Sequence, residues 1–229
     1  MAQFILKRVA QNILSLTALV VLFAVVAGTP LVGGLWLYAM TVIVYQVISL
    51  LLIVPKHPAY MELAVRRQLK RENAKAWDKV LVWLLSICSL LMYVVAALDL
   101  GRLQWGLLTW QFALLGIALY ALGSGFNQWA MLHNPNFERL VRIQGESEHH
   151  VAATGPYQYL RHPGYLGSVL FYVGFPLIVG SGLSFLPSIV CIGTLMVRTY
   201  LEDRTLIEEL DGYRDYTENV RYRLLPHLW

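Results

Sequence analysis

Long runs of residues without a charge dominate this chain. A bilayer core about 30 Å thick is crossed by about 20 helical residues, so each run is long enough for at least one membrane-spanning helix. The first run is long enough for two, and helix breakers at Gly28-Thr29-Pro30 and Gly33-Gly34 predict where it divides. The uncharged runs are Val9–Pro55, Val80–Leu98, Leu103–Phe137 and His162–Val197.

The last two runs carry further breaks. The helix within Leu103–Phe137 is expected to stop near His133-Asn134-Pro135, because a residue before proline disfavours helix. Gly180-Ser181-Gly182 divides the final run into arms of about 18 residues, or roughly 27 Å each. These arms are either two short crossing helices or a hairpin that enters and leaves on one side. The pattern predicts an all-α, polytopic membrane helix bundle of five to six transmembrane segments, the last two forming a short hairpin.

Composition excludes a soluble globular protein. Of the 229 residues 57% are hydrophobic and only 14% are charged, against about 25% charged in soluble domains, and the mean hydropathy is +0.54. The two cysteines, Cys88 and Cys191, lie in apolar stretches without neighbouring cysteine or histidine ligands. We therefore expect buried packing thiols, with no disulfide framework and no metal site.

The basic residues are sorted by membrane side. All of the 18 lysines and arginines except Arg102 fall near the N-terminus, in the 56–79 and 133–162 loops, or from Arg198 onwards. The positive-inside rule then predicts an integral membrane protein with both termini in the cytoplasm, and we expect the plasma (inner) membrane. The net charge of +4 therefore reflects topology, and nucleic acid is not an expected partner.

The N-terminal half raises the alternatives of a cleaved signal peptide, an interfacial helix and a transporter. The first apolar stretch merges directly into the second, which favours a retained helix over a cleaved signal peptide. The 56–79 loop mixes basic and apolar residues, so it is either an interfacial helix or a solvated connector. Because no ionisable residue lies in the middle of a predicted span, a transporter is disfavoured.

Titratable residues gather in the last 100 residues, on the predicted cytoplasmic side. Arg198 and Glu202 are four positions apart and share a helix face, which alone indicates an i,i+4 salt bridge. Gly155-Pro156 and His162-Pro163, taken singly, indicate turns. Each of these features is common by itself.

In combination these motifs resemble the isoprenylcysteine carboxyl methyltransferase and phospholipid methyltransferase superfamily. The motifs are Gly155-Pro156-Tyr157, Arg161-His162-Pro163-Gly164-Tyr165-Leu166-Gly167, Arg198 with Glu202-Asp203 and Leu206, and the tail from Gly212-Tyr213 to Pro226. The resemblance covers roughly residues 142–229. It covers the first 130 residues only as a hydropathy profile. We therefore expect two parts: transmembrane helices 1–4 in residues 1–132, with a basic cytosolic loop at 56–79, and a catalytic region in residues 133–229 with the cofactor loop, the helical hairpin and a cytosolic tail.

The resemblance also implies S-adenosylmethionine as cofactor. It assigns Arg198 to the substrate side, as an anchor. The second acid of the usual Glu-Glu pair is Asp203 here, and the stretch before His149 differs from the family pattern in length. Gly123-Ser124-Gly125 resembles the Gly-x-Gly of the phospholipid enzymes, although small residues in membrane helices also permit close packing. The implied cofactor contacts are Gln144, His149, His150, Val151, Ala152, Tyr157, His162, Pro163, Gly164, Tyr165 and Glu202.

These residue types suit the donor. A zwitterionic amino acid with a sulfonium group needs an acid for its ammonium group and hydrogen-bond donors for its carboxylate. We therefore expect an integral-membrane methyltransferase whose partners are membrane lipids and a lipophilic or small acceptor that offers a carboxylate, an amine or a thiol. The alternative is a non-catalytic membrane scaffold or assembly protein that retains the fold.

Overall fold

The computed structural model describes the whole chain except residues 1, 30–31, 54–74, 135–136, 138–150 and 227. Within the described residues there are seven α-helices and no strand. π-helical turns extend α2 through Ser49–Ile53 and α4 through Asp99–Leu103. The helices are α1 (Ala2–Ala27), α2 (Gly33–Ile48), α4 (Ala76–Leu98), α5 (Gln111–His133), α6 (Pro163–Val179), α7 (Phe185–Glu209) and α8 (Tyr213–Asn219).

The helix breaks predicted at Gly28, His133 and Gly180 are confirmed, whereas Gly33-Gly34, also predicted as breakers, form the first residues of α2. α1 ends just before Gly28, α5 ends at His133, and α6 ends just before Gly180. Gly28 and Gly180 have φ angles of 82° and 84°, in the left-handed region that only glycine adopts readily. Both helices therefore end where the chain turns back.

The protein is a polytopic helical membrane bundle, as predicted. Four helices in the described part of the chain are long and apolar enough to cross a bilayer, and their apolar segments are Val9–Ala27, Gly33–Leu51, Ala76–Leu103 and Phe185–Glu209. α6 is apolar but has only 17 residues. α5 has 23 residues but is less apolar, because Asn127 and Gln128 lie in its last third. These two helices pack along one another more extensively than any other pair.

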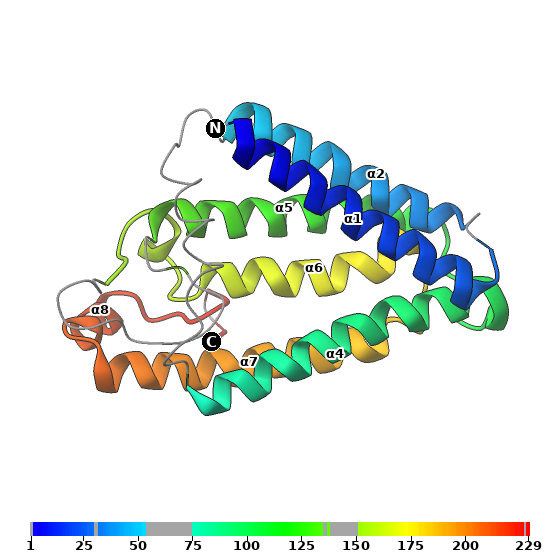
Figure 1. Cartoon of the computed structure of the whole chain (residues 1–229). Helices are drawn as coiled ribbons and strands as arrows, with labels where there is room; N and C mark the ends of the chain where they lie inside the picture. Colours follow the sequence, from blue (N-terminus) through cyan, green and yellow to red (C-terminus); the bar gives the residue numbers. More distant parts are fainter. Residues whose placement is uncertain (1, 30–31, 54–74, 135–136, 138–150, 227) are drawn as a thin grey trace.

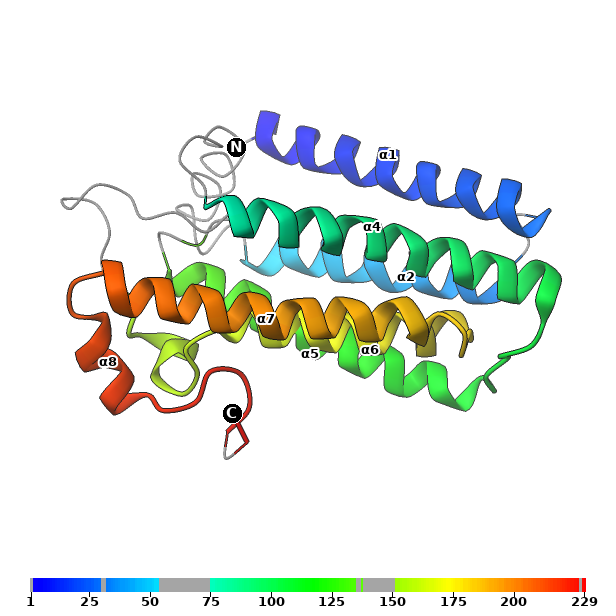
Figure 2. The ribbon, with the colours of Figure 1, turned by 90° about the horizontal axis from the view of Figure 1, so that it is seen from below.

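α6 lies at the centre of the bundle. It packs against α5, α7 and α2, while α4 runs beside α7 and α1 (Figures 1 and 2). Gly123 of α5 and Gly167 of α6 bring the two backbones into direct contact, since a Cβ built on Gly123 would lie 2.5 Å from the Gly167 carbonyl oxygen. Small residues at crossings allow this approach in membrane bundles. Cys88 and Cys191 are buried in the same core, as predicted, and both thiols are free.

The two ends of the bundle differ in charge. The start of α1, the C-terminus and α8 lie at one end, which we call the terminal end; the α1–α2, α4–α5 and α6–α7 turns lie at the other (Figure 1). Arg102 follows α4 at the far end, whereas Lys75, Lys79 and the arginines of α7, α8 and the tail lie toward the terminal end. Among the basic residues whose side chains the structure describes, all except Arg102 thus lie toward the terminal end, as the predicted separation requires. That the terminal end faces the cytoplasm stays a prediction, and most of the 56–79 loop lies outside the described residues.

Candidate functional site

The sequence motifs converge at the terminal end. A short 3₁₀ turn, Gly155–Gln158, precedes His162 at the N-cap position of α6. Pro163 occupies the first helical position, where proline is favoured. The tail folds back onto this segment, because the Arg161 and His162 amides donate to the Tyr222 and Arg223 carbonyls, each over 2.9 Å. The start of α6 and the end of the chain are therefore held together.

Asp203 organises this region. The residue is fully buried, and its Oδ2 accepts from Arg161 Nη1 over 2.9 Å and from Arg223 Nε over 2.8 Å. Its Oδ1 accepts from the Tyr213 hydroxyl over 3.0 Å and lies 3.3 Å from His162 Nε2. The residue that departs from the family's Glu-Glu pattern thus joins α6, α7, α8 and the tail. Charge-assisted hydrogen bonds of this kind are stronger than neutral ones.

Two tyrosines of α8, Tyr213 and Tyr216, contact the cluster. The Tyr216 hydroxyl donates to the Tyr157 carbonyl over 2.6 Å, and Asn134 Nδ2 donates to the Tyr157 hydroxyl over 3.2 Å. Burial, and then the negative charge of Asp203, raise the pKa of Tyr213; burial also raises the pKa of Tyr216. Both hydroxyls therefore stay protonated at neutral pH and act as hydrogen-bond donors.

Glu202, beside Asp203, belongs to a second set of contacts. Its carboxylate accepts a short hydrogen bond from the Tyr165 hydroxyl. The Tyr165 ring is stacked with the His162 ring, with centroids 5.6 Å apart and planes 3° from parallel. Glu202 and His162, which the resemblance assigns to the same cofactor, therefore contact the same tyrosine.

Arg198 also contacts Tyr165. Its guanidinium carbon is 5.1 Å from the centre of the Tyr165 ring, within the range of a cation–π contact. Arg198 Nε donates to Asp78 Oδ1 over 2.6 Å and its Nη2 donates to Asp78 Oδ2 over 3.2 Å. The two-point grip that suits a carboxylate is thus made with Asp78 of α4. The role of Arg198 as a substrate anchor stays a prediction.

One polar atom in the cluster is left unpaired. Arg161 Nε is the buried side-chain nitrogen or oxygen that lacks a hydrogen-bond partner among the described residues. An unpaired buried donor costs about 1–3 kcal/mol, and such an atom is satisfied when a ligand brings an acceptor. Arg161 Nη1 donates to Asp203 and Nη2 donates to the Arg221 carbonyl, so Nε is the guanidinium position without a partner among the described residues.

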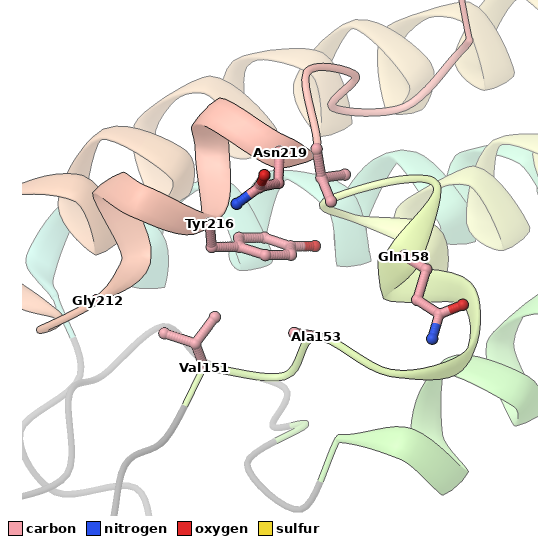
Figure 3. A pocket seen from close by; sticks show the side chains of 7 residues that line it. Val151, Ala153, Gln158, Gly212, Tyr216 and Asn219 are labelled. Carbon is pink, nitrogen blue, oxygen red and sulfur yellow. The ribbon is translucent and has the colours of Figure 1, made fainter.

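An open groove borders this cluster (Figure 3). Its volume is about 480 Å³. The Tyr216 side chain projects between α8 and the segment that carries Val151 and Ala153. The lining residues are Val151, Ala153, Gln158, Gly212, Tyr216, Asn219 and Val220.

The implied cofactor residues are brought together in part. Val151 lines the groove, and Ala152 follows Val151 in the chain. Tyr157 accepts from Tyr216 through its carbonyl, and His162 is stacked with Tyr165. Pro163 and Gly164 are buried at the start of α6. Gln144, His149 and His150 lie outside the described residues, so their part stays a prediction.

Sequence reasoning missed four contributors. Asp78, Tyr213, Tyr216 and Arg223 had no assigned role, although they bind residues of the motifs. Asp78 and Arg198 are 120 positions apart, and spacing along the chain carries no signal over that separation. Asp78 also precedes the predicted Val80–Leu98 run and falls in the 56–79 loop, so the pattern of uncharged runs carried no signal for a buried acid there.

The fold and site define a helical membrane protein with a buried polar cluster at one end. Residues 111–210 match the family described as phospholipid methyltransferase. A protein-S-isoprenylcysteine O-methyltransferase from Saccharomyces cerevisiae (strain ATCC 204508 / S288c) is 29% identical over 113 residues, which are 48% of this chain and 45% of the yeast protein. The chain therefore aligns with less than half of that relative's length. Both comparisons confirm the resemblance to the isoprenylcysteine and phospholipid methyltransferase superfamily.

Proposed function

We propose that this protein is a membrane methyltransferase that takes its methyl group from S-adenosylmethionine at the terminal end of the bundle. The observation that carries the proposal is a pair of connections within the cluster. Tyr165 contacts both Glu202 and His162, and Asp203, the residue after Glu202, binds Arg161. An acid and an unpaired buried donor therefore lie in one polar cluster. The family match and the yeast relative support the same reaction class.

The residues of the cluster fit the donor chemically. Glu202 would hold the ammonium group, while Arg161 Nε and His162 would donate to the carboxylate. The groove beside Tyr216 has small and apolar walls with two carboxamides, Gln158 and Asn219, which suits a heteroaromatic ring. When bound, S-adenosylmethionine supplies an activated methyl carbon, so the protein's contribution is to position the acceptor and exclude water.

A second cavity is our candidate for the acceptor. It has a volume of about 360 Å³, lies between α2, α5 and α6, and is lined by uncharged polar and aromatic side chains. Phe137 lines it, and the same ring lies 2.6 Å from where a Cβ on Gly164 would be. The cavity thus adjoins the His162-Pro163-Gly164 turn. The lining includes Tyr45, Gln46, Ser49, Tyr120, Ser124, Asn127, Gln128, Ser168 and Tyr172.

This arrangement agrees with a lipid-borne acceptor that reaches the turn from within the bundle. We further propose that the terminal end faces the cytoplasm, where the soluble donor is available, and that the protein resides in the plasma (inner) membrane. The acceptor offers a carboxylate, an amine or a thiol. Arg198, if it contacts the acceptor, does so with its charge already paired with Asp78.

The test is a methyl-transfer assay with purified protein in lipid nanodiscs. Methyl-labelled S-adenosylmethionine is supplied with a total lipid extract, and labelled products are identified by mass spectrometry. We expect a labelled lipid that is absent when Glu202→Gln protein is used. A protein that binds the donor but labels nothing would favour the non-catalytic scaffold.

A further inference from the structure

Asp78 lies outside the residues that match the methyltransferase family, which begin at 111. It is in the first turn of α4, its side chain has no exposed surface, and both of its oxygens accept from Arg198. α4 and α7 pack along each other, so this ion pair joins the N-terminal helices to the candidate site. Removal of one partner of a buried pair leaves an uncompensated charge.

The ion pair continues into the site. Arg198 contacts the face of Tyr165, whose hydroxyl donates to Glu202. The chain of contacts from Asp78 to Glu202 therefore runs through two residues, one on α7 and one on α6. A shift of Asp78 would change how Arg198 and Tyr165 hold the Glu202 carboxylate.

The same residues set the local charge. Asp78, Arg198 and Glu202 together carry one net negative charge, whereas Arg161, Arg223 and Asp203 together carry one net positive charge. His162 and Tyr165 lie between the two groups, since His162 contacts Asp203 and Tyr165 contacts Glu202. Without Asp78, Arg198 would cancel the charge of Glu202.

We propose that Asp78 is a positioning residue that keeps the Glu202 side of the site negative, so that the site binds the sulfonium form of the donor in preference to the thioether product. This inference rests on the proposed function. S-adenosylmethionine carries one more positive charge than S-adenosylhomocysteine, because transfer of the methyl group leaves a neutral sulfur. A negative group near the donor therefore favours release of the product after reaction.

The test compares equilibrium binding of the two ligands to the purified full chain. The measured quantity is the ratio of the Kd for S-adenosylhomocysteine to the Kd for S-adenosylmethionine, determined by calorimetry in one detergent buffer. Asp78→Asn is expected to lower this ratio about three- to tenfold, because Asp78 acts through Arg198 and Tyr165 and its charge is screened at the ligand. Arg198→Gln is expected to raise it, because that change removes a positive charge.

Shifts of the Kd ratio in opposite directions in Asp78→Asn and Arg198→Gln distinguish an effect of charge from a loss of packing. A loss of packing would weaken the binding of both ligands alike in both variants. Asp78→Glu keeps the charge and is expected to keep the ratio, which covers the case in which Asp78→Asn does not fold. Glu208→Gln removes a negative charge from an exposed pair with Arg204 at the same end and is expected to leave the ratio unchanged. A ratio that is equal in wild type, Asp78→Asn and Arg198→Gln overturns the inference. Wild-type protein that binds neither ligand overturns the proposed function itself.

Discussion

His162 Nε2 lies 3.3 Å from Asp203 Oδ1, although the two residues are 41 positions apart in the chain. This contact connects the turn that starts α6 with the last third of α7. Because Asp203 also binds Arg161, Arg223 and Tyr213, one carboxylate links the motif segment to α8 and the tail.

Asp203→Asn is expected to destabilise this end of the molecule. The amide cannot balance two arginines, and breaking a buried ionic network costs about 3–5 kcal/mol. We expect a lower unfolding temperature in detergent and faster proteolysis between α7 and the C-terminus. The matched change Asp211→Asn, at an exposed position, should alter neither quantity; equal behaviour of the two variants would show that Asp203 does not organise the tail.

Arg161→Lys is expected to weaken donor binding. Lysine keeps the positive charge beside Asp203 but lacks the Nε–H that has no partner in the described structure. A charged hydrogen bond is worth about 1.5–3 kcal/mol, so the Kd for S-adenosylmethionine should rise roughly tenfold or more. Arg214→Lys, at an exposed position on α8, is the control. An unchanged Kd in Arg161→Lys would remove the carboxylate assignment.

Gly123→Ala is expected to lower stability. A Cβ at this position would lie 2.5 Å from the Gly167 carbonyl oxygen, and forced overpacking costs about 1–3 kcal/mol. Gly125 has open space around it, so Gly125→Ala should unfold at the wild-type temperature. Loss of donor binding in Gly125→Ala, with normal stability, would instead support a cofactor role for the Gly-x-Gly segment.

Gln128→Leu is expected to impair acceptor use while donor binding is kept. Gln128 lines the cavity between α2, α5 and α6, and its amide donates to Ser49 over 2.5 Å. The KM for the lipid acceptor should rise severalfold with an unchanged Kd for S-adenosylmethionine. Gln111→Leu, at the exposed opposite end of α5, serves as the control. A normal KM in Gln128→Leu would exclude this cavity as the acceptor site.

Much of the fold could be predicted because the rules are local. Charge-free runs and breakers such as Gly28 and Gly180 indicate where helices end, and the structure ends α1 and α6 just before these residues. The π-helical extensions of α2 and α4 were not predicted, since the hydrophobic pattern does not distinguish a π-helical turn from an α-helical one. The division into residues 1–132 and 133–229 stays a prediction about function.

The site could be predicted only where its residues are close in sequence. His162, Tyr165 and Glu202 belong to recognisable motifs, and the structure joins them in one cluster. The partner of Arg198 could not be predicted in this way. The spacing suggested Glu202, one helical turn away, but Arg198 makes its two-point contact with Asp78 on another helix. Pairing between helices depends on their register in the bundle, which the sequence of a single chain does not encode locally.

The most direct test of the central claim is equilibrium binding of S-adenosylmethionine to purified wild-type and Glu202→Gln protein. The amide keeps the shape of the side chain and can still accept from Tyr165, so folding should be preserved. We predict a measurable Kd for the wild type and a Kd at least tenfold higher for Glu202→Gln, with equal unfolding temperatures. Equal affinity in the two proteins would contradict the account.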